Sequence, residues 1–478
     1  MKPFLLVVLV NLTFVLFRVL YILLYPVDLS PEEAQYWDWS RHPDLSYYSK
    51  PPMVAYMNLI TRTVFGNTEI GVRITPVVLS FLLSLLVFYF LRRHTDTRIA
   101  LLCSTLPNLM VGHAVNSVLM TTDAPLLFFW ALTLITLYEA SLRRSVVLWL
   151  LTGVWAGLAF LSKYTAVLIL PMGILYLWLT DRQQLRSWRP YVSLLPAFLI
   201  SLPVLIWNYQ NDWVSLKHLA GLSTSGASFP NLSTFLEFLG GQVLLMSVVP
   251  FFLMVLGWFR FRDRFGIFLT SFSLPVFLFF CLLSLRKEVY ANWTAPGMFA
   301  GTVLAVLYMA RRPVLILSFA GISIPLFVLL HFTPVVDRLG LKDLIPPERD
   351  PVRVMVGWSE LGREVSKLYR KGDLILSDRY QIAAELAFYV RGNPRTFVFH
   401  RGRRTQYYLW RDLLKDYKGR DGLFITESYP PEGLKKSFSS IEFLKSMDIH
   451  WRGERIRTFR IYRVKGFSGV LHESPSGY

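Results

Sequence analysis

Long apolar runs, separated by short polar segments, fill the first two thirds of the chain. A helix needs roughly 17–25 apolar residues to cross the hydrocarbon core of a bilayer. The pattern therefore predicts a polytopic bundle of about 11–13 membrane helices. The expected spans are residues 4–25, 72–91, 98–112, 123–140, 145–161, 165–180, 189–208, 236–257, 265–284, 293–309 and 313–331.

Basic residues gather in alternate loops of this map, and their placement predicts its orientation. With the N-terminus in the cytoplasm, the cytoplasmic turns hold many arginines, whereas the longer outer loops hold few basic residues for their length. The positive-inside rule describes this asymmetry. Eleven spans would then put the C-terminus outside. The arginines of the cytoplasmic turns are Arg92, Arg93, Arg143, Arg144, Arg182, Arg186, Arg189, Arg260, Arg262, Arg264, Arg311 and Arg312.

The pattern changes after the last span. A proline-rich segment, Pro346–Pro351, is followed by short apolar runs that alternate with helix-like ones. We therefore expect a membrane domain, residues 1–335, and a small α/β domain, residues 336–478, on the outer side. Its expected strands are 374–377, 396–399, 423–426 and a terminal hairpin with 456–464, and its expected helices are 381–390 and 405–417.

Composition supports a membrane protein. Of the 478 residues, 53% are hydrophobic and 17% are charged, and the mean hydropathy is +0.41, whereas soluble domains carry about 25% charged residues. The net charge of +18 would suit nucleic acid. Because much of it lies in short loops between spans, we expect membrane lipids and no nucleic acid as partners. The two cysteines, Cys103 and Cys281, lie in apolar runs and imply no disulfide framework.

The outer loop 26–71 carries two adjacent carboxylates, Glu32 and Glu33, just after the first span. Such a carboxylate can be a general base, a metal ligand or a solvated charge, and the solvated charge is the commonest case in a loop. The aromatic context favours a site, although an interfacial aromatic belt would explain the rings alone. Residues 52–64 could form a helix on the membrane surface. The nearby aromatic residues are Tyr36, Trp37, Trp39, Tyr47 and Tyr48.

Asp123 lies in a Thr-Asp-Ala-Pro segment at the outer start of a predicted span. Its simplest role is that of a helix N-terminal carboxylate, stabilised by the helix dipole, with Pro125 in the first turn. An equally weighted alternative is a second carboxylate of an active site, beside His113 at the mouth of the third and fourth spans. Residues 378–381, at a strand-to-helix turn, could contact an acceptor, but an ordinary helix start explains them more simply.

Four cations share the outer face with these carboxylates: Lys50, Lys163, Arg286 and Lys287. Snorkelling toward lipid head groups explains each of them singly. Together, beside three carboxylates, they favour a cationic clamp on a phosphate or pyrophosphate leaving group.

These motifs, in this order, resemble the polyprenyl-phosphate-sugar-dependent glycosyltransferases with the membrane C-type glycosyltransferase fold. That superfamily contains protein O-mannosyltransferases, the lipid A aminoarabinose transferase and lipopolysaccharide-core galacturonosyltransferases. Its first outer loop carries an Asp-Glu pair followed by Tyr, here Glu32-Glu33 and Tyr36, and closes on aromatics and Pro-Pro, here residues 47–52. Asp123 matches its second acidic residue. The resemblance covers residues 26–300.

The resemblance implies an inverting transfer of a sugar from polyprenyl phosphate, undecaprenyl phosphate in a bacterium. The implied acceptor is a hydroxyl or phosphate of lipid A, another glycolipid or another molecule outside the cytoplasm. The implied catalytic carboxylates are Glu32, Asp123 and Glu33. The implied ligands of the donor phosphate are Lys50, which takes the place of a phosphate-contacting lysine of the aminoarabinose transferases, and Lys163, Arg286 and Lys287. The implied substrate-binding residues are Tyr36, Tyr47, Tyr48, His113 and Tyr290.

Two positions depart from the family pattern. Glu32 stands where aspartate is usual, and Gln35 stands where the aminoarabinose transferases have arginine. The base role therefore stays open among the three carboxylates, and the sugar contacts are expected to differ. Glu32 and Asp123 could instead hold a divalent cation, Mg²⁺ or Mn²⁺, through hard oxygen ligands. We expect no other cofactor, and a monomer in the cytoplasmic (inner) membrane with its site facing the periplasm.

Rival classes predict other patterns. A protein O-glycosyltransferase differs only in its acceptor. A flippase or transporter should show repeated halves and charges near the bilayer midplane, whereas here the charges cluster at one face. Arg18, within the first span, is an exception to this clustering. A glycan polymerase or ligase usually has its large outer segment between spans. A receptor would not need the acidic loop and the outer cations together.

Overall fold

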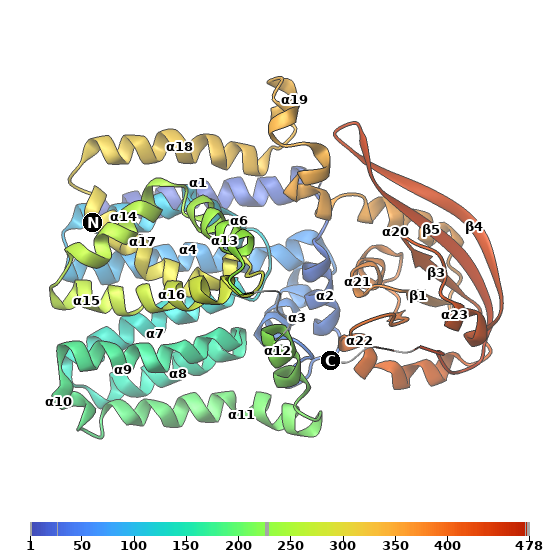
Figure 1. Cartoon of the computed structure of the whole chain (residues 1–478), viewed down its shortest axis with the longest axis horizontal. Helices are drawn as coiled ribbons and strands as arrows, with labels where there is room; N and C mark the ends of the chain where they lie inside the picture. The colour runs from blue at the N-terminus through green and yellow to red at the C-terminus, as the bar shows by residue number, and fades with distance from the viewer. Residues whose placement is uncertain (1, 26, 225–228, 474, 476–478) are drawn as a thin grey trace.

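The computed structural model describes residues 2–25, 27–224, 229–473 and 475. Figure 1 shows a bundle of long helices beside a C-terminal part built on a sheet, with the N-terminus at the end of the bundle away from the sheet. This arrangement confirms the predicted fold class. Residue 26, the first of the predicted outer loop, and residues 476–478 of the predicted C-terminal domain lie outside the described residues.

Within the described part of the chain, six helices are long and apolar enough to cross a membrane, or seven if one bent pair forms a single span. Four of the six are single elements: α1 (Lys2–Leu24), α4 (Glu69–His94), α7 (Asp123–Arg143) and α18 (Pro313–His331). The fifth, Pro190–Gln210, contains α11 (Leu194–Gln210), and the sixth, Arg264–Ser284, contains α15 (Arg264–Ser271) and α16 (Leu274–Ser284). Shorter members are α5 (Thr97–Thr105), α6 (Val111–Asn116), α8 (Val146–Ser162), α9 (Ile169–Thr180), α10 (Arg182–Leu185), α12 (Val214–Thr224), α13 (Leu232–Leu245), α14 (Val249–Arg260) and α17 (Ala295–Met309).

Two predicted spans are broken, which corrects the sequence map. The run 98–112 divides into α5, a 3₁₀ turn and α6, because Pro107 lacks the amide hydrogen that would continue the helix. The run 236–257 divides into α13 and α14, which meet at 99°. Ser247 and Val248 make this corner with φ angles of 56° and 65°, which are unfavourable for a β-branched residue. The Ser247 hydroxyl accepts the amide of Val111 at 3.1 Å, which ties the corner to α6.

Small residues allow neighbouring helices of the bundle to approach closely. Gly153 and Gly157, one turn apart on α8, face α11 and the turn that leads into it. A Cβ atom at Gly153 would lie 2.0 Å from the Ser193 carbonyl oxygen, and one at Gly157 would lie 2.8 Å from the Ile200 side chain. Without a hydrophobic force between helices in lipid, such close packing is a main source of association.

Two short helices, α2 (Pro31–Ser40) and α3 (Met53–Phe65), form the outer segment after α1. The α3 helix confirms the helix predicted at 52–64. The α2 helix begins with a capping box, in which the Ser30 hydroxyl accepts the Glu33 amide while the Glu33 carboxylate accepts the Ser30 amide. All of its residues except Glu32 are buried.

A buried ion pair fixes α2 on the bundle. Arg73 of α4 donates from Nε and Nη2 to the two carboxylate oxygens of Glu33, at 3.0 and 2.8 Å. The side chains of Arg73 and Glu33 are 1% and 0% exposed. Glu33 also accepts the amide of Met120, just before α7, at 2.9 Å. One carboxylate therefore connects α2, α4 and the approach to α7.

The C-terminal part is a five-stranded mixed sheet with strand order β2-β1-β3-β5-β4, in which β1 pairs in parallel with β2 and β3, and β5 is antiparallel to β3 and β4. The strands confirm the four predicted ones, and α21 confirms the helix predicted at 381–390. The helix predicted at 405–417 is broken at Trp410, whose ring packs 4.9 Å from that of His42. The elements are α19 (Val335–Arg338), α20 (Trp358–Leu368), β1 (Leu374–Ser377), α21 (Tyr380–Tyr389), β2 (Thr396–Val398), α22 (Gln406–Leu409), β3 (Gly422–Thr426), α23 (Glu432–Ser437), β4 (Phe438–Trp451) and β5 (Glu454–Phe467).

The two parts meet on α2, which lies between the bundle and α21 (Figure 1). The Trp37 ring packs edge-on against Phe388 of α21, with centroids 4.9 Å apart. The Asp28 carboxylate accepts the first amides of α20, including that of Trp358 at 2.7 Å. The Tyr407 hydroxyl donates to Asp38 at 2.8 Å. Apolar and polar contacts together therefore hold the sheet against the outer helix.

Replacing Glu33 by glutamine should destabilise the protein, because it leaves the Arg73 guanidinium buried without a counter-charge. Breaking a buried pair in this way costs about 3–5 kcal/mol of unfolding free energy. The measurement is the denaturant midpoint of the purified protein in detergent. The matched control is Glu360→Gln, at an exposed position of α20, where a change within about 0.5 kcal/mol is expected. Equal midpoints for both variants would contradict the anchoring role of Glu33.

Candidate active site

Asp123 and Lys163 form a buried ion pair at the end of the bundle that carries α2. The Lys163 ammonium donates to Asp123 Oδ1 at 2.6 Å, and the Asn292 amide donates to Oδ2 at 2.7 Å. The side chains of Lys163 and Asp123 are 9% and 7% exposed. Asp123 begins α7, as the sequence predicted, while Lys163 follows the end of α8 in an extended conformation. The helix-start role and the site role of Asp123 are therefore compatible.

Lys50 joins this pair, since its nearest charges come from the same cluster. The loss of solvation is the largest effect on Lys50 and lowers its pKa, and the like charge of Lys163 lowers it further. The carboxylates of Asp123 and Glu32 act in the opposite direction, and the resulting pKa is about 8. Arg403, from the C-terminal part, adds to the lowering. Lys50 is therefore readily deprotonated for a lysine. The structure brings together four of the predicted site residues.

Glu32 occupies the first turn of α2 and is the one accessible carboxylate of this cluster. Surrounding protein atoms displace part of its hydration and raise its pKa, and the neighbouring Glu33 charge adds to the rise. A hydrogen bond from the Tyr380 hydroxyl and the charge of Lys50 act in the opposite direction. A carboxylate with a raised pKa is better matched to accept a proton near neutral pH than an ordinary one.

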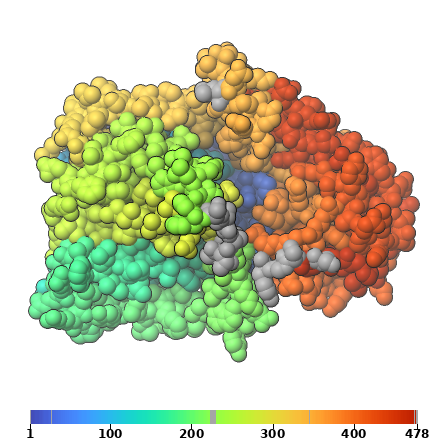
Figure 2. Space-filling model, in the orientation of Figure 1, coloured from blue at the N-terminus to red at the C-terminus, as the bar shows by residue number. Residues whose placement is uncertain are grey.

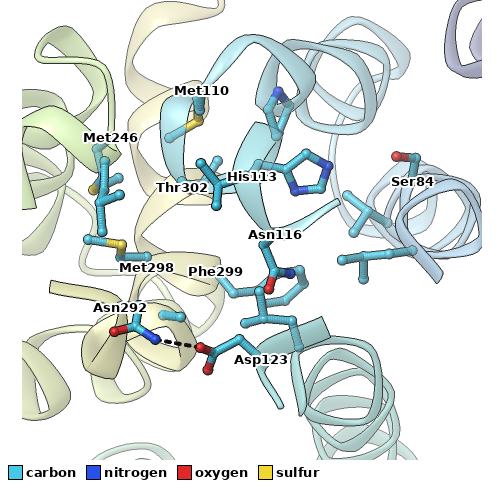
Figure 3. A pocket seen from close by; sticks show the side chains of 18 of the residues that line it. Ser84, Met110, His113, Asn116, Asp123, Met246, Asn292, Met298, Phe299 and Thr302 are labelled. Atoms are coloured by element: carbon cyan, nitrogen blue, oxygen red, sulfur yellow. Dashed lines mark hydrogen bonds between the residues drawn. The ribbon is translucent and has the colours of Figure 1, made fainter. Parts of the chain in front are cut away.

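An apolar cavity of about 270 Å³ runs from Asp123 and Asn292 into the bundle (Figure 3). It reaches Val87 and Cys103, deep between α4 and α5. The corner between α13 and α14 contributes Met246 to its wall. Other residues of its wall are Ser84, Met110, His113, Asn116, Met298, Phe299 and Thr302.

His113 therefore lies where the sequence analysis put it, at the mouth formed by α6 and α7. It lines the cavity on the side opposite Asn292 (Figure 3). Its Nε2 atom is buried and has no hydrogen-bond partner within the described part of the chain. It is thus a polar group on an apolar wall near Asp123.

Of the four predicted tyrosines, Tyr36 and Tyr290 differ in their exposure to solvent. Tyr36 is buried beside the charged cluster. Burial raises the pKa of its hydroxyl most, and the nearby Glu32, Tyr380 and Asp123 raise it further. Tyr290 is exposed and packs 5.9 Å from the Trp293 ring.

Tyr47 and Tyr48 instead shape the loop that carries Lys50. The Tyr47 hydroxyl donates to the carbonyl oxygens of Trp39 and His42, at 3.1 Å each, and its ring stacks on Trp39. The backbone amide of Tyr48 donates to Gln406 of the C-terminal part at 2.7 Å. These two tyrosines therefore position the loop.

The charged groups of three predicted residues, Glu33, Arg286 and Lys287, contact partners outside this cluster. Both oxygens of Glu33 are taken by Arg73, so its geometry favours anchoring over proton transfer. The Arg286 guanidinium lies over the Phe229 ring at 5.5 Å, and the Lys287 ammonium over the Trp293 ring at 5.6 Å. Sequence reasoning grouped these cations by their face of the membrane, which does not fix the direction of a side chain.

The structure also adds residues that the sequence analysis did not select. Asn292 holds Asp123, Tyr380 holds Glu32, and Arg403 acts on Lys50. Tyr380 lies in the turn 378–381 that was considered for acceptor contact. The basic run 401–404 was a visible signal for Arg403. The sequence gives no such signal for Asn292, because a single asparagine just before a membrane span is common.

The donor set does not fit a divalent cation. Among the residues that the structure describes, no three His, Cys, Asp or Glu side chains form a group that could hold a metal ion. The Asp123 oxygens are occupied by Lys163 and Asn292, and Lys50 adds a second ammonium. Mg²⁺ and Ca²⁺ prefer free carboxylate and carbonyl oxygens. The reaction proposed for this chain therefore has no step through a metal.

Comparison with known proteins identifies the class. The family described as dolichyl-phosphate-mannose-protein mannosyltransferase matches residues 49–207. The chain is 30% identical to lipid A galacturonosyltransferase RgtD of Rhizobium johnstonii over 89% of this chain and 93% of that protein. It is 31% identical to the undecaprenyl phosphate-α-4-amino-4-deoxy-L-arabinose arabinosyl transferase of Pseudomonas aeruginosa, over 33% of this chain and 30% of that protein.

Solved structures share the fold of this chain. The structure of ArnT from Cupriavidus metallidurans bound to undecaprenyl phosphate superposes with a TM-score of 0.67 and 14% identity, over 98% of this chain and 99% of that one. The archaeal oligosaccharyltransferase AglB of Archaeoglobus fulgidus superposes with a TM-score of 0.51 and 12% identity, over 89% and 69% of the two chains.

The chain is thus a multi-pass membrane glycosyltransferase of the C-type fold. It belongs to the family of lipid A galacturonosyltransferase RgtD, because the similarity spans nearly all of both proteins. The resemblance inferred from the acidic loop, Lys50 and Asp123 is confirmed at the level of family, fold and enzyme class.

A double-mutant cycle should show that Asp123 and Lys163 are energetically coupled. Asp123→Asn leaves a buried ammonium without its anion and should cost about 3–5 kcal/mol of unfolding free energy. Adding Lys163→Met removes the unpaired charge, so the double variant should recover part of this loss, with a coupling of about 1–3 kcal/mol. The measurement is the denaturant midpoint of all four proteins. Strict additivity of the two single effects would contradict a direct ion pair.

Proposed function

We propose that this enzyme transfers a sugar from undecaprenyl phosphate to the head group of lipid A or a closely related glycolipid. The single observation behind the proposal is the cluster of Glu32, Lys50, Asp123 and Lys163 at the mouth of an apolar cavity. A ligand with an anionic group on a long apolar tail needs charged side chains for the anion and an apolar cavity for the tail. Galacturonic acid is the first candidate sugar, because the relative similar over nearly its whole length is a galacturonosyltransferase.

The apolar cavity would receive the first part of the polyprenyl tail. Its wall is mostly aliphatic and aromatic, and Asp123 and Asn292 mark its polar end. Burying apolar groups contributes about 25 cal/mol for each Å² removed from water or its interface. The tail would thus hold the donor while its phosphate stays among the cations.

Lys50 and Lys163 would bind the phosphate that leaves. Lys163 pairs with Asp123, and Lys50 lies close enough for the charges of both to shift its pKa, so two cations lie together in a poorly solvated place. With Arg403 counted, three cations face the two carboxylates of Glu32 and Asp123, so a phosphate would arrive where positive charge is in excess. Cations fixed before the reaction stabilise charge that develops on a leaving group, and cost no reorganisation when it develops.

Glu32 would act as the general base. It is accessible, lies beside Lys50 and receives a hydrogen bond from Tyr380. The acceptor hydroxyl would attack the anomeric carbon from the face opposite the phosphate as the bond between carbon and phosphate oxygen breaks. Its proton would pass to Glu32, and polyprenyl phosphate would leave with the bonding electron pair. The product would have inverted configuration, and Asp123 would orient Lys163 through their ion pair.

The proposal also assigns the side of the membrane. Loop charge supports cytoplasmic turns at the end of the bundle away from the sheet, so the site and C-terminal domain would face the periplasm. The enzyme would work as a monomer among membrane lipids. A protein hydroxyl is the alternative acceptor, favoured by the family description that matches residues 49–207.

Glu32→Gln should strongly lower the rate of transfer without affecting folding, because the accessible side chain keeps its size and loses only the base. Removing a general base lowers the rate by about 10²–10⁴-fold. The measurement is transfer from undecaprenyl phosphate galacturonic acid and aminoarabinose to lipid A and to peptide acceptors. Glu288→Gln, an exposed acid elsewhere in the chain, is the control and should keep wild-type activity. Full activity of Glu32→Gln would overturn the base assignment.

Donor binding should weaken as pH rises through about 8, because the Lys50 pKa is lowered to about 8 and the ammonium loses its charge above that value. The measurement is the Kd of undecaprenyl phosphate from pH 7 to 9.5. Lys50→Arg should remove this dependence, since a guanidinium stays charged to a pH above about 12. The same pH dependence in wild type and Lys50→Arg would contradict the role of Lys50.

A further inference from the structure

A second cleft, of about 630 Å³, separates the start of α2 from the C-terminal part. Glu32 lies on its wall, whereas Asp123 does not. The wall of the apolar cavity, by contrast, includes Asp123 and not Glu32. Figure 2 shows the blue N-terminal part recessed between the yellow-green helices and the orange C-terminal part. Glu32 is therefore the proposed catalytic group that faces the second cleft.

Four arginines line this cleft, and we call it the arginine cleft. Arg379 and Arg457 share the carboxylate of Glu427, at 2.9 and 3.1 Å. Arg460 donates to the backbone oxygen of the same residue at 2.8 Å. The fourth, Arg353, is exposed, and its guanidinium has no hydrogen bond or ion pair within the described part of the chain.

The positive charge of the arginine cleft exceeds its negative charge. Four guanidiniums face two carboxylates, Glu427 and Glu32. Burial lowers the pKa of Arg457, the charges of Glu427 and Glu385 oppose this shift, and the like charges of Arg353 and Arg379 add to it. The Nη1 atom of Arg457 is buried and has no acceptor among the described residues. A buried donor without an acceptor is destabilising, and a bound anion would supply the missing acceptor.

The arginine cleft opens beside the outer end of α1. Val352 and Val356 flank Arg353 and pack in one apolar core with Val27, and Tyr21 and Tyr25 of this end of the chain pack against that core. Since α1 is a membrane span, the cleft lies close to the membrane surface. A ligand that is anchored in the bilayer can reach it.

We propose that the arginine cleft binds the anionic sugar head group of the acceptor glycolipid and presents its hydroxyl to Glu32. The inference rests on the proposed function, because it needs Glu32 as the base. Guanidinium groups bind phosphate and carboxylate through paired hydrogen bonds, which fix orientation as well as position. The donor phosphate and the acceptor anion would thus lie on different sides of Glu32.

The kinetic test uses Arg353→Gln and Arg379→Gln in the full-length protein. Both side chains are exposed, so folding should be retained. The expected result is a rise of about tenfold in KM for a phosphorylated lipid A acceptor, as for the loss of one charge-assisted hydrogen bond, with kcat and the donor KM little changed. Arg455→Gln is the matched control, because Arg455 of β5 is exposed like Arg353 and Arg379 but does not line the cleft.

A binding test separates this inference from the proposed function. Phosphorylated lipid A, its dephosphorylated form and inorganic phosphate are each titrated against wild type and both variants. Tighter binding of phosphorylated lipid A, lost in the variants, would support the cleft even if no sugar were transferred. Transfer with an acceptor KM unchanged from the Arg455→Gln control would overturn the cleft and leave the proposed function intact. A rise in donor KM alone, or binding of inorganic phosphate as tight as lipid A, would also overturn it.

Discussion

The buried ion pair between Glu33 and Arg73 is the contact on which the arrangement of this enzyme depends. It replaces the hydration of two charges with bidentate hydrogen bonds, and it adds a capping bond to α2 and a bond to the chain before α7. Because a buried charge tolerates little displacement from its partner, α2 is fixed relative to the bundle. Glu32, the residue just before Glu33 on α2, is thereby held in a fixed and accessible position.

The fixed position of α2 also determines where the C-terminal part can lie. Nearly every face of this short helix is buried, against the bundle on one side and α21 on the other. The sheet is thus held by contacts to the outer segment, and it brings Tyr380 and Arg403 to the charged cluster. The cluster is completed by residues separated by hundreds of positions in the chain.

Charge balance gives the two cavities different characters. At the apolar cavity, the three cations Lys50, Lys163 and Arg403 outnumber the carboxylates of Asp123 and Glu32, so the site at its polar end favours one more anion. At the arginine cleft, Glu427 neutralises part of a group of four guanidiniums. Glu32 lies between these regions and is more accessible than either Asp123 or Glu33. This order suits a reaction between two anionic, lipid-anchored molecules.

The sequence by itself determined the membrane class, the family, the strands of the C-terminal sheet and four charged residues of the site. These properties follow from local patterns: apolar run length, period-two alternation and acidic or basic residues beside span ends. Only the tertiary structure decided that Glu33 is an anchor, that Arg286 and Lys287 lie over aromatic rings, and that Asn292, Tyr380 and Arg403 join the site. The bends at Pro107 and Ser247 were likewise hidden, because an apolar run has the same composition whether straight or broken. Side-chain direction and long-range pairing depend on packing between distant segments, which no local pattern encodes.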